Sequence, residues 1–215
     1  MSLILDLIFP KICYGCGKTG EHLCSECQKH LTILNVKAPK NGFDGGLSLF
    51  KYQSFIKSAI TDLKYNFVSD NATNLADLMA KILKSDFPNL VRYWRQNNFI
   101  LIPIPLHPSR QNWRGFNQSE LLSQKLAKNL SLDFSNEVLI RHQSTAIQAR
   151  LKKTTDRTKN VANIFSLYPS IGNLKNKNFI LFDDVSTTQS TLISALSVLK
   201  TLPPSYCWYL TLSAG

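Results

Sequence analysis

Four of the five cysteines lie between Cys13 and Cys27, where they form the pairs Cys13–Cys16 and Cys24–Cys27. Each C-x2-C pair can aim two sulfur atoms at one point, and two such pairs complete a tetrahedral site for zinc or iron. Four protein ligands leave no open coordination position, so the metal would be structural. We predict zinc, with two disulfides or a redox pair as the alternatives.

A second group of reactive side chains follows the apolar run Phe179–Phe182. Asp183 and Asp184 come first. A hydroxyl-rich turn then leads into a predicted helix and consists of Ser186, Thr187, Thr188, Gln189, Ser190 and Thr191. Two carboxylates can hold sugar hydroxyls and Mg²⁺, and the N–H groups at a helix start favour phosphate. We therefore predict a ribose 5-phosphate site; an ordinary helix cap would explain only one Asp and one Ser.

Basic and aromatic residues follow another predicted strand, Phe99–Ile104. Arg110 and Arg114 are expected on a loop at its carboxyl end, where they can bind pyrophosphate or a nucleic-acid phosphate. Trp113 lies between them and can stack on a base of single-stranded DNA. The alternative for Trp113 is an ordinary surface position.

The elements that must position these residues alternate between strand and helix. Strands are predicted over 49–52, 99–104, 179–182 and 207–212, and helices over 55–65, 72–84, 120–130 and 191–199. This alternation predicts an α/β fold, a mostly parallel sheet with helices on both faces, whose carboxyl ends collect the site. We expect a zinc module over 1–34, a linker over 35–48 and the α/β domain over 49–215.

The net charge of +11 in 215 residues, with a pI near 9.5, favours binding to polyanions. The 44% hydrophobic content argues against global disorder. No apolar run approaches the roughly 20 residues that span a bilayer, and the apolar Leu3–Phe9 lacks the marks of a secretory signal. We expect a cytoplasmic protein, with a peripheral position at the inner membrane as a further option.

The turn after the acidic pair resembles the phosphoribosyl-pyrophosphate (PRPP) motif of type I phosphoribosyltransferases, two acidic residues followed by Thr-Thr-Gly-x-Thr. Gln189 replaces the motif's glycine. The order of segments is similar to that of the ComF competence family. The matching segments are Cys13–Cys27, Leu63-Lys-Tyr65, Pro103–Leu106, Arg114-Gly-Phe-Asn-Gln118, Arg141–Gln148, Arg157-x-x-Asn160-Val with Phe165, and Asp183–Thr191.

The resemblance implies a type I phosphoribosyltransferase fold with an N-terminal zinc finger. It also implies a role in DNA uptake during natural transformation. The implied ligands are single-stranded DNA and PRPP or a related phosphate, the latter bound with Mg²⁺, and the implied protein partner is a competence helicase. The alternatives are an active phosphoribosyltransferase acting on a base or amine, and a phosphate-binding scaffold for other proteins. Gln189 argues against turnover, because a non-glycine residue enters the left-handed region at a cost of roughly 1 kcal/mol. We assign no catalytic residue.

Overall fold

The computed structural model describes residues 10–65, 69–142, 164–169, 174, 177–203 and 205–215. Its centre is a five-stranded sheet with the order β1-β7-β6-β2-β3, and every neighbouring pair is parallel. The strands are β1 (Gly45–Lys51), β2 (Phe99–Pro103), β3 (Asp133–Phe134), β6 (Asn178–Ser186) and β7 (Cys207–Ala214). A separate antiparallel pair joins β4 (Leu139–Arg141) to β5 (Phe165–Leu167).

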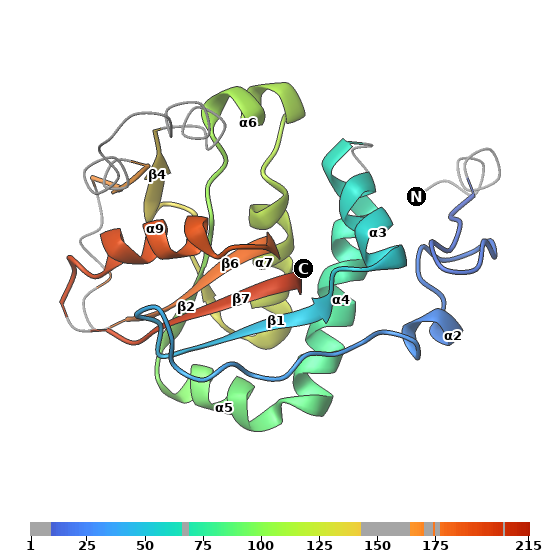
Figure 1. The fold of residues 1–215 in the computed structure, drawn as a ribbon, viewed down its shortest axis with the longest axis horizontal. Coiled ribbons are helices and arrows are strands. Elements are labelled where there is room, and N and C mark those ends of the chain that lie inside the picture. Colours follow the sequence, from blue (N-terminus) through green and yellow to red (C-terminus); the bar gives the residue numbers. More distant parts are fainter. Residues whose placement is uncertain (1–9, 66–68, 143–163, 170–173, 175–176, 204) are drawn as a thin grey trace.

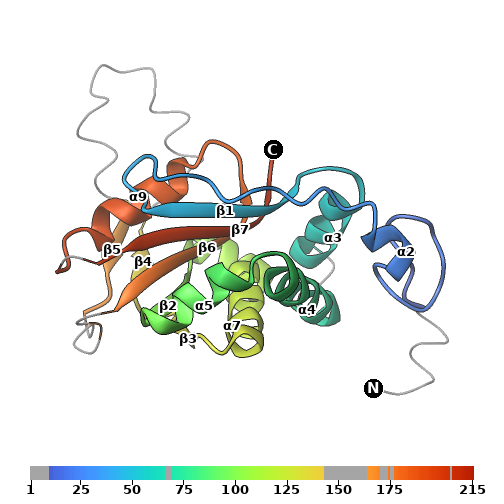
Figure 2. The same ribbon diagram turned by 90° about the horizontal axis from the view of Figure 1, so that it is seen from below.

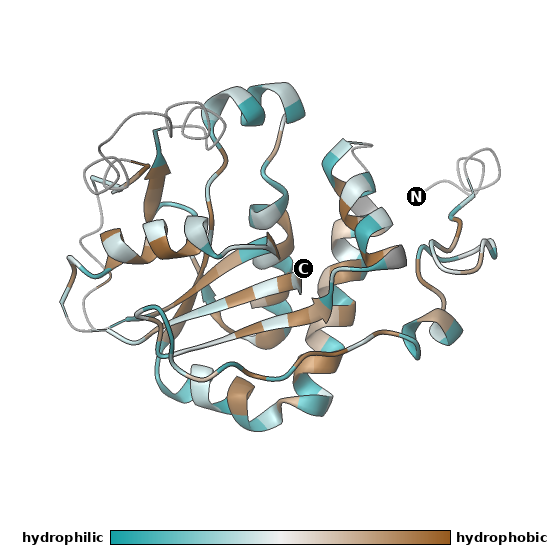
Figure 3. Cartoon of the chain, viewed as in Figure 1, coloured by the Kyte–Doolittle hydropathy of each residue, from teal (hydrophilic) through white to brown (hydrophobic). Residues whose placement is uncertain are grey.

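Helices cover both faces of the sheet (Figures 1 and 2), which confirms the predicted fold class. The larger helices are α3 (Ser54–Tyr65), α4 (Ser69–Asp86), α5 (Pro88–Gln96), α7 (Gln118–Leu130) and α9 (Ser190–Leu199). One buried cluster joins α3, α4, α5 and α7 to one face, and a second joins α9, β4 and β5 to the other. The hydropathy colouring shows apolar residues along the strands and polar ones along the short helix α6 (Pro108–Arg114) (Figure 3).

β1 begins at Gly45, earlier than the predicted strand over 49–52. Glycine has a low strand propensity, so the two glycines read as a turn. In the structure the rings of Trp208 and Tyr209 lie directly over Gly45 and Gly46, where an added Cβ would approach within 2.5 Å and 1.9 Å. These glycines are therefore strand residues that give the β7 aromatic rings room to pack.

The segment before α7 is a helix, α6, and not the loop that the sequence predicted. Pro108 occupies its first turn, where a missing N–H has no consequence, and His107 accepts a hydrogen bond from the Ser109 amide as its N-cap. Gly115 ends the helix at φ 76°. Arg110, Trp113 and Arg114 are therefore held on one short, capped helix at the carboxyl edge of the sheet.

The N-terminal region packs against the α/β core. Tyr14, Leu23 and Leu31 contact the larger buried cluster, and backbone bridges join Ile33 to Phe50 and Lys37 to Gly46. The domain limits 1–34, 35–48 and 49–215 stay a proposal.

Within the described ranges, the structure contains no helix with the length and apolar character needed to cross a bilayer. The apolar Leu3–Phe9 lies outside those ranges, as do residues 143–163, which include Arg157 and Asn160 of the family resemblance.

Candidate functional site

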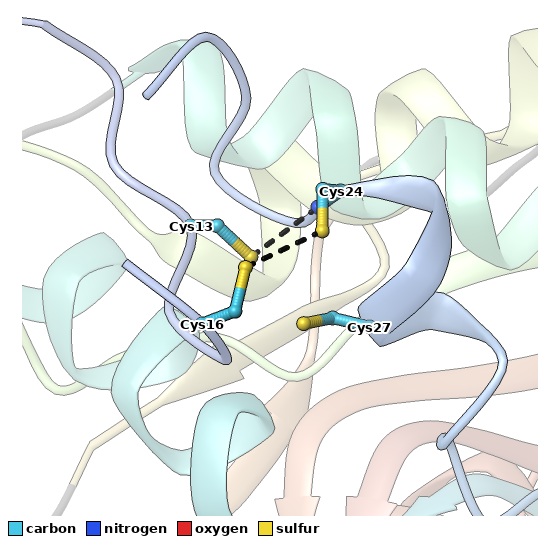
Figure 4. A group of neighbouring side chains, drawn as sticks. All are labelled: Cys13, Cys16, Cys24 and Cys27. Carbon is cyan, nitrogen blue, oxygen red and sulfur yellow. Dashed lines mark hydrogen bonds between the residues drawn. The ribbon is translucent and has the colours of Figure 1, made fainter. Parts of the chain in front are cut away.

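The four cysteines of the two C-x2-C pairs converge on one point (Figure 4). Their Sγ atoms all lie within 4.8 Å of one another, and Cys16 Sγ lies 3.6 Å from Cys24 Sγ. A tetrahedral zinc with bonds of about 2.3 Å separates its sulfurs by roughly 3.8 Å. The four side chains are therefore close enough to hold a metal ion such as zinc.

The backbone around Cys13 favours a thiolate. Burial by itself raises the pKa of the Cys13 thiol. Hydrogen bonds from the backbone amides of Cys24, Cys16 and Gly15 outweigh this effect and lower the pKa to about 6, below its ordinary value of 9.0. One of these bonds joins Cys24 N to Cys13 Sγ at 3.4 Å. Burial, together with the neighbouring thiols, raises the pKa of Cys27 to about 12. A cation among these sulfurs would favour the thiolate form of all four, as metal ligation requires.

The acidic pair lies at the carboxyl end of β6 and is already engaged by other side chains. Lys64 Nζ, from the last turn of α3, lies 2.7 Å from Asp184 Oδ2. Gln118 Nε2, at the start of α7, donates to the same oxygen at 3.1 Å. Asp184 is only 4% exposed, so these two contacts balance a carboxylate that is almost removed from water.

Asp183 has a different environment. Its Oδ1 accepts hydrogen bonds from Ser119 Oγ at 3.1 Å and from the Asp184 amide at 2.9 Å. Burial, followed by the Asp184 charge, nevertheless raises the pKa of Asp183 to about 7. Burial also lowers the pKa of Arg141, while the Asp183 charge opposes this shift and the Arg110 charge adds to it. These charges therefore lie close enough to interact.

Arg114 is connected to the acidic pair through Gln118. Its Nη1 donates to Gln118 Oε1 at 3.0 Å, and its guanidinium lies 5.2 Å from the centre of the Tyr65 ring. The side chain is 7% exposed, and Nε makes no hydrogen bond. Within the described ranges no carboxylate lies in ion-pair contact with Arg114. Among the described residues its buried positive charge thus has no carboxylate counter-ion.

Trp113 extends from the same helix into solvent and is 67% exposed. Its ring packs edge to face on the ring of Tyr65, with 5.9 Å between the two ring centres, and Tyr65 is itself 51% exposed. The two rings form an exposed aromatic pair beside the buried Arg114. The exposed position of Trp113 is compatible with the predicted stacking on DNA as well as with the alternative of an ordinary surface residue, and the structure adds Tyr65 as its neighbour.

The hydroxyl-rich turn joins β6 to α9. Gln189 has φ 58° and lies in the left-handed region, as expected for the position where the resembled motif has glycine. Its Oε1 accepts a hydrogen bond from Asn41 Nδ2 at 3.4 Å, and its side chain makes no capping bond to α9. A hollow of about 40 Å³ is bounded by the turn and Asp183. The first turn of α9 therefore presents N–H groups beside this hollow.

The structure thus collects Asp183, Asp184, the turn, Arg114 and Trp113 at one edge of the sheet, with Arg110 near Arg141. The segment over residues 13–27, which carries the cysteines, lies away from this edge, on the far side of α3 and α4 in Figure 1. Sequence reasoning did not single out Lys64, Gln118, Ser119 or Arg141 as site residues. The available signal was that Lys64, Gln118 and Arg141 belong to segments of the family resemblance.

No family model matches the chain. Over 102 residues it is 39% identical to "Competence protein F" of Haemophilus influenzae, which covers 47% of this chain and 44% of that protein. It is 27% identical over 202 residues to "DNA utilization protein YhgH" of Escherichia coli strain K12, covering 87% of this chain and 82% of that protein. It is also 27% identical over 202 residues to "Competence protein ComFC" of Bacillus subtilis, covering 85% and 75%.

The Haemophilus match spans less than half of that relative's length, whereas the Escherichia and Bacillus matches run through most of both chains. The N-terminal cysteine cluster and the segments gathered at the carboxyl edge are those that carried the resemblance in the sequence. Over most of its length the chain is therefore similar to competence and DNA utilization proteins, which agrees with its resemblance to the ComF competence family.

Proposed function

We propose that this protein handles DNA in natural transformation and that the carboxyl edge of its sheet binds single-stranded DNA and PRPP or a related phosphate. The names of the relatives, competence proteins and DNA utilization proteins, support this role. The observation that carries the proposal is that Lys64 and Gln118 contact Asp184 of the acidic pair, while Arg114 donates to Gln118 next to an exposed aromatic pair.

The phosphate part of the proposal rests on the turn and on Asp183. The left-handed Gln189 directs the chain into α9, whose first-turn N–H groups have no carbonyl partner within the helix and can donate to an anion. The Ser190 amide donates to Thr188 Oγ1 at 3.5 Å, a long contact that an anion could replace. The raised pKa of Asp183 means that a neighbouring cation is favourable, because it would stabilise the ionised carboxylate. Mg²⁺ carried by PRPP is the ion we propose for this position, with Asp183 and Asp184 holding the ribose hydroxyls.

The DNA part rests on Arg114, Trp113 and Tyr65. The Arg114 guanidinium is buried and has no carboxylate counter-ion among the described residues. A phosphate bound at this edge would neutralise that charge, so its binding free energy should be more favourable here than beside an exposed arginine. Exposed rings beside that charge provide the stacking surface that single-stranded DNA uses. The net charge of +11 would attract the strand at long range.

We also propose that the metal of the cysteine cluster is zinc and that its role is structural. Cys13, Cys16, Cys24 and Cys27 would occupy all four positions of a tetrahedral ion. Tyr14, between the first two cysteines, packs on the α/β core, so metal-dependent folding of the cluster would help to hold the N-terminal region in place.

The proposal is tested by DNA-binding titrations at several salt concentrations. Arg114→Ala should weaken binding to an oligothymidylate and reduce the slope of log affinity against log salt by about 0.7, because one phosphate contact is lost. Trp113→Ala should weaken binding by roughly 1–3 kcal/mol and leave the slope unchanged, since stacking releases no counter-ions. Arg110→Ala, exposed on the same helix, should resemble Arg114→Ala.

Lys81→Ala is the matched control, because Lys81 is exposed on α4 and bounds neither the turn nor the aromatic pair. Circular dichroism establishes that each variant is folded. If the wild type does not bind DNA in about 0.1 M salt, or if neither Arg114→Ala nor Trp113→Ala weakens it beyond the control, this edge is not the DNA site. PRPP-dependent pyrophosphate release against a panel of bases tests the alternative of an active transferase.

A further inference from the structure

A second, larger hollow adjoins the hydroxyl-rich turn, apart from the small hollow beside Asp183 where we propose that ribose 5-phosphate binds. It is an open groove of about 610 Å³, in the size range of ligand sites. Ser186–Gln189 form one wall, Lys37–Asn41 form another, and Ser48, Tyr209 and Ala214 complete it. Asp183 bounds only the smaller hollow, so the turn separates the acidic pair from this groove.

The backbone holds the lysine-bearing wall in place. The Lys37 amide donates to the Gly46 carbonyl at 2.7 Å, and the Gly46 amide donates to the Lys37 carbonyl at 3.3 Å. Lys40 and Phe43 form the same reciprocal pair of backbone hydrogen bonds, at 3.2 Å and 3.0 Å. Asn41 then contacts the turn through Gln189. The segment is thus attached to β1 on one side and to the turn on the other.

The groove carries positive charge. Lys37 and Lys40 are both exposed, and no aspartate or glutamate is found among the described residues that line it. The remaining walls supply neutral hydrogen-bonding groups from Ser48 and the turn hydroxyls. Because its ammonium groups lack acidic neighbours in the lining, the groove is suited to an anionic ligand that extends away from the turn.

A DNA strand has the connectivity that such a layout requires. Each phosphodiester joins the 5′ oxygen of one sugar to the 3′ oxygen of the preceding sugar. If the turn holds the phosphate, the two nucleotides joined by it can lie on opposite sides of the turn, and the preceding nucleotide then leaves on the side away from Asp183. That side is the groove with Lys37 and Lys40.

We propose that the groove binds the nucleotide on the 5′ side of a phosphodiester held by the turn, with Lys37 and Lys40 contacting its phosphate. This inference rests on the proposed phosphate and DNA binding and names the ligand of the turn as an internal phosphate of a single strand. PRPP and the strand then share the turn, and the two lysines contact only the strand.

The test compares an oligothymidylate with ribose 5-phosphate on the wild type, on Lys37→Ala with Lys40→Ala, and on a control with Lys81→Ala and Lys84→Ala. The control removes the same charge from exposed positions of α4. The groove variant should bind the oligonucleotide at least fivefold more weakly than the control does, with a salt slope lower by about 1.4 for two lost contacts. Its affinity for ribose 5-phosphate should match that of the control, and ribose 5-phosphate should displace the oligonucleotide from the wild type.

Three results would overturn the inference. One is unchanged oligonucleotide binding in the groove variant. Another is an equal loss of affinity for the oligonucleotide and for ribose 5-phosphate, which would mean that the lysines act only through the overall positive charge of the protein. The third is failure of ribose 5-phosphate to compete. If the wild type itself does not bind the oligonucleotide, the proposed DNA binding falls together with this inference; the three results above overturn the inference alone, so the two failures are distinguishable.

Discussion

Removing the cation beside Asp184 should destabilise the folded protein strongly. Lys64→Met keeps most of the side-chain length and removes the charge. The carboxylate of Asp184 would then be left with Gln118 as its remaining described partner, in a position that is 4% exposed. An unbalanced buried charge is the main reason why breaking a buried ion pair is unfavourable.

The magnitude follows from the burial of the two side chains. Removing one partner of a buried pair costs about 3–5 kcal/mol. The Lys64 side chain is 22% exposed and Asp184 keeps the hydrogen bond from Gln118, so we expect the lower end, about 3 kcal/mol. Adding Asp184→Asn should recover most of this loss, because a neutral amide does not need a cation.

Urea unfolding of the zinc-loaded protein measures the effect. With a slope of about 2 kcal/mol per M, the midpoint should fall by roughly 1.5 M for Lys64→Met. Lys29→Met is the control, because Lys29 pairs with Glu26 at 2.8 Å but both side chains are about two-thirds exposed, at 67% and 66%. That pair should contribute less than about 1 kcal/mol. If Lys64→Met is no more harmful than Lys29→Met, or if adding Asp184→Asn recovers nothing, the account of the site as a balanced buried network is wrong.

Three further predictions concern the metal, the acidic pair and the turn. Cys16→Ser should lower the bound zinc measured by elemental analysis and reduce the unfolding free energy; wild-type protein purified without chelator that contains no metal would contradict the proposed centre. The pKa of Asp183 is about 7 in the folded protein and about 3.8, its ordinary value, in the unfolded chain. Between these pH values the folded protein binds the extra proton, so the contribution of Asp183 to the unfolding free energy should fall as the pH rises. The stability of Asp183→Asn relative to the wild type should therefore increase from about pH 4 to about pH 7, and a pH-independent difference would exclude this assignment. Asp183→Asn combined with Asp184→Asn should abolish calorimetric binding of PRPP with Mg²⁺, and no binding by the wild type at millimolar PRPP would refute the pocket. Gln189→Gly should strengthen the binding, because it removes a side chain that crowds the phosphate and lets the backbone approach it closely.

Much of the fold could be predicted from local pattern. The helices over 55–65, 72–84, 120–130 and 191–199 correspond to α3, α4, α7 and α9, and the buried runs after residues 98 and 178 correspond to β2 and β6. Apolar spacing carries this information, because the same side chains form the two buried clusters. The convergence of the cysteines also followed from their spacing, since each C-x2-C turn is a local structure.

Local pattern failed where packing outweighs propensity. Gly45 and Gly46 read as a turn, yet they are strand residues because the rings of Trp208 and Tyr209 need their space. α6 is only seven residues long and has too few apolar positions to show a helical period, so its caps alone define it.

The partners of the acidic pair could be found only in the tertiary structure. Lys64 and Gln118 reach the same oxygen of Asp184 from α3 and α7, and Ser119 reaches Asp183 across 64 positions of sequence. Nothing in the periodicity of a helix specifies which of its polar residues will meet a distant carboxylate. The parallel strand order and the packing of α3 and α7 on the sheet bring these groups together, and burial of Asp184 then makes their contacts necessary, because a carboxylate removed from water must be neutralised by a neighbour.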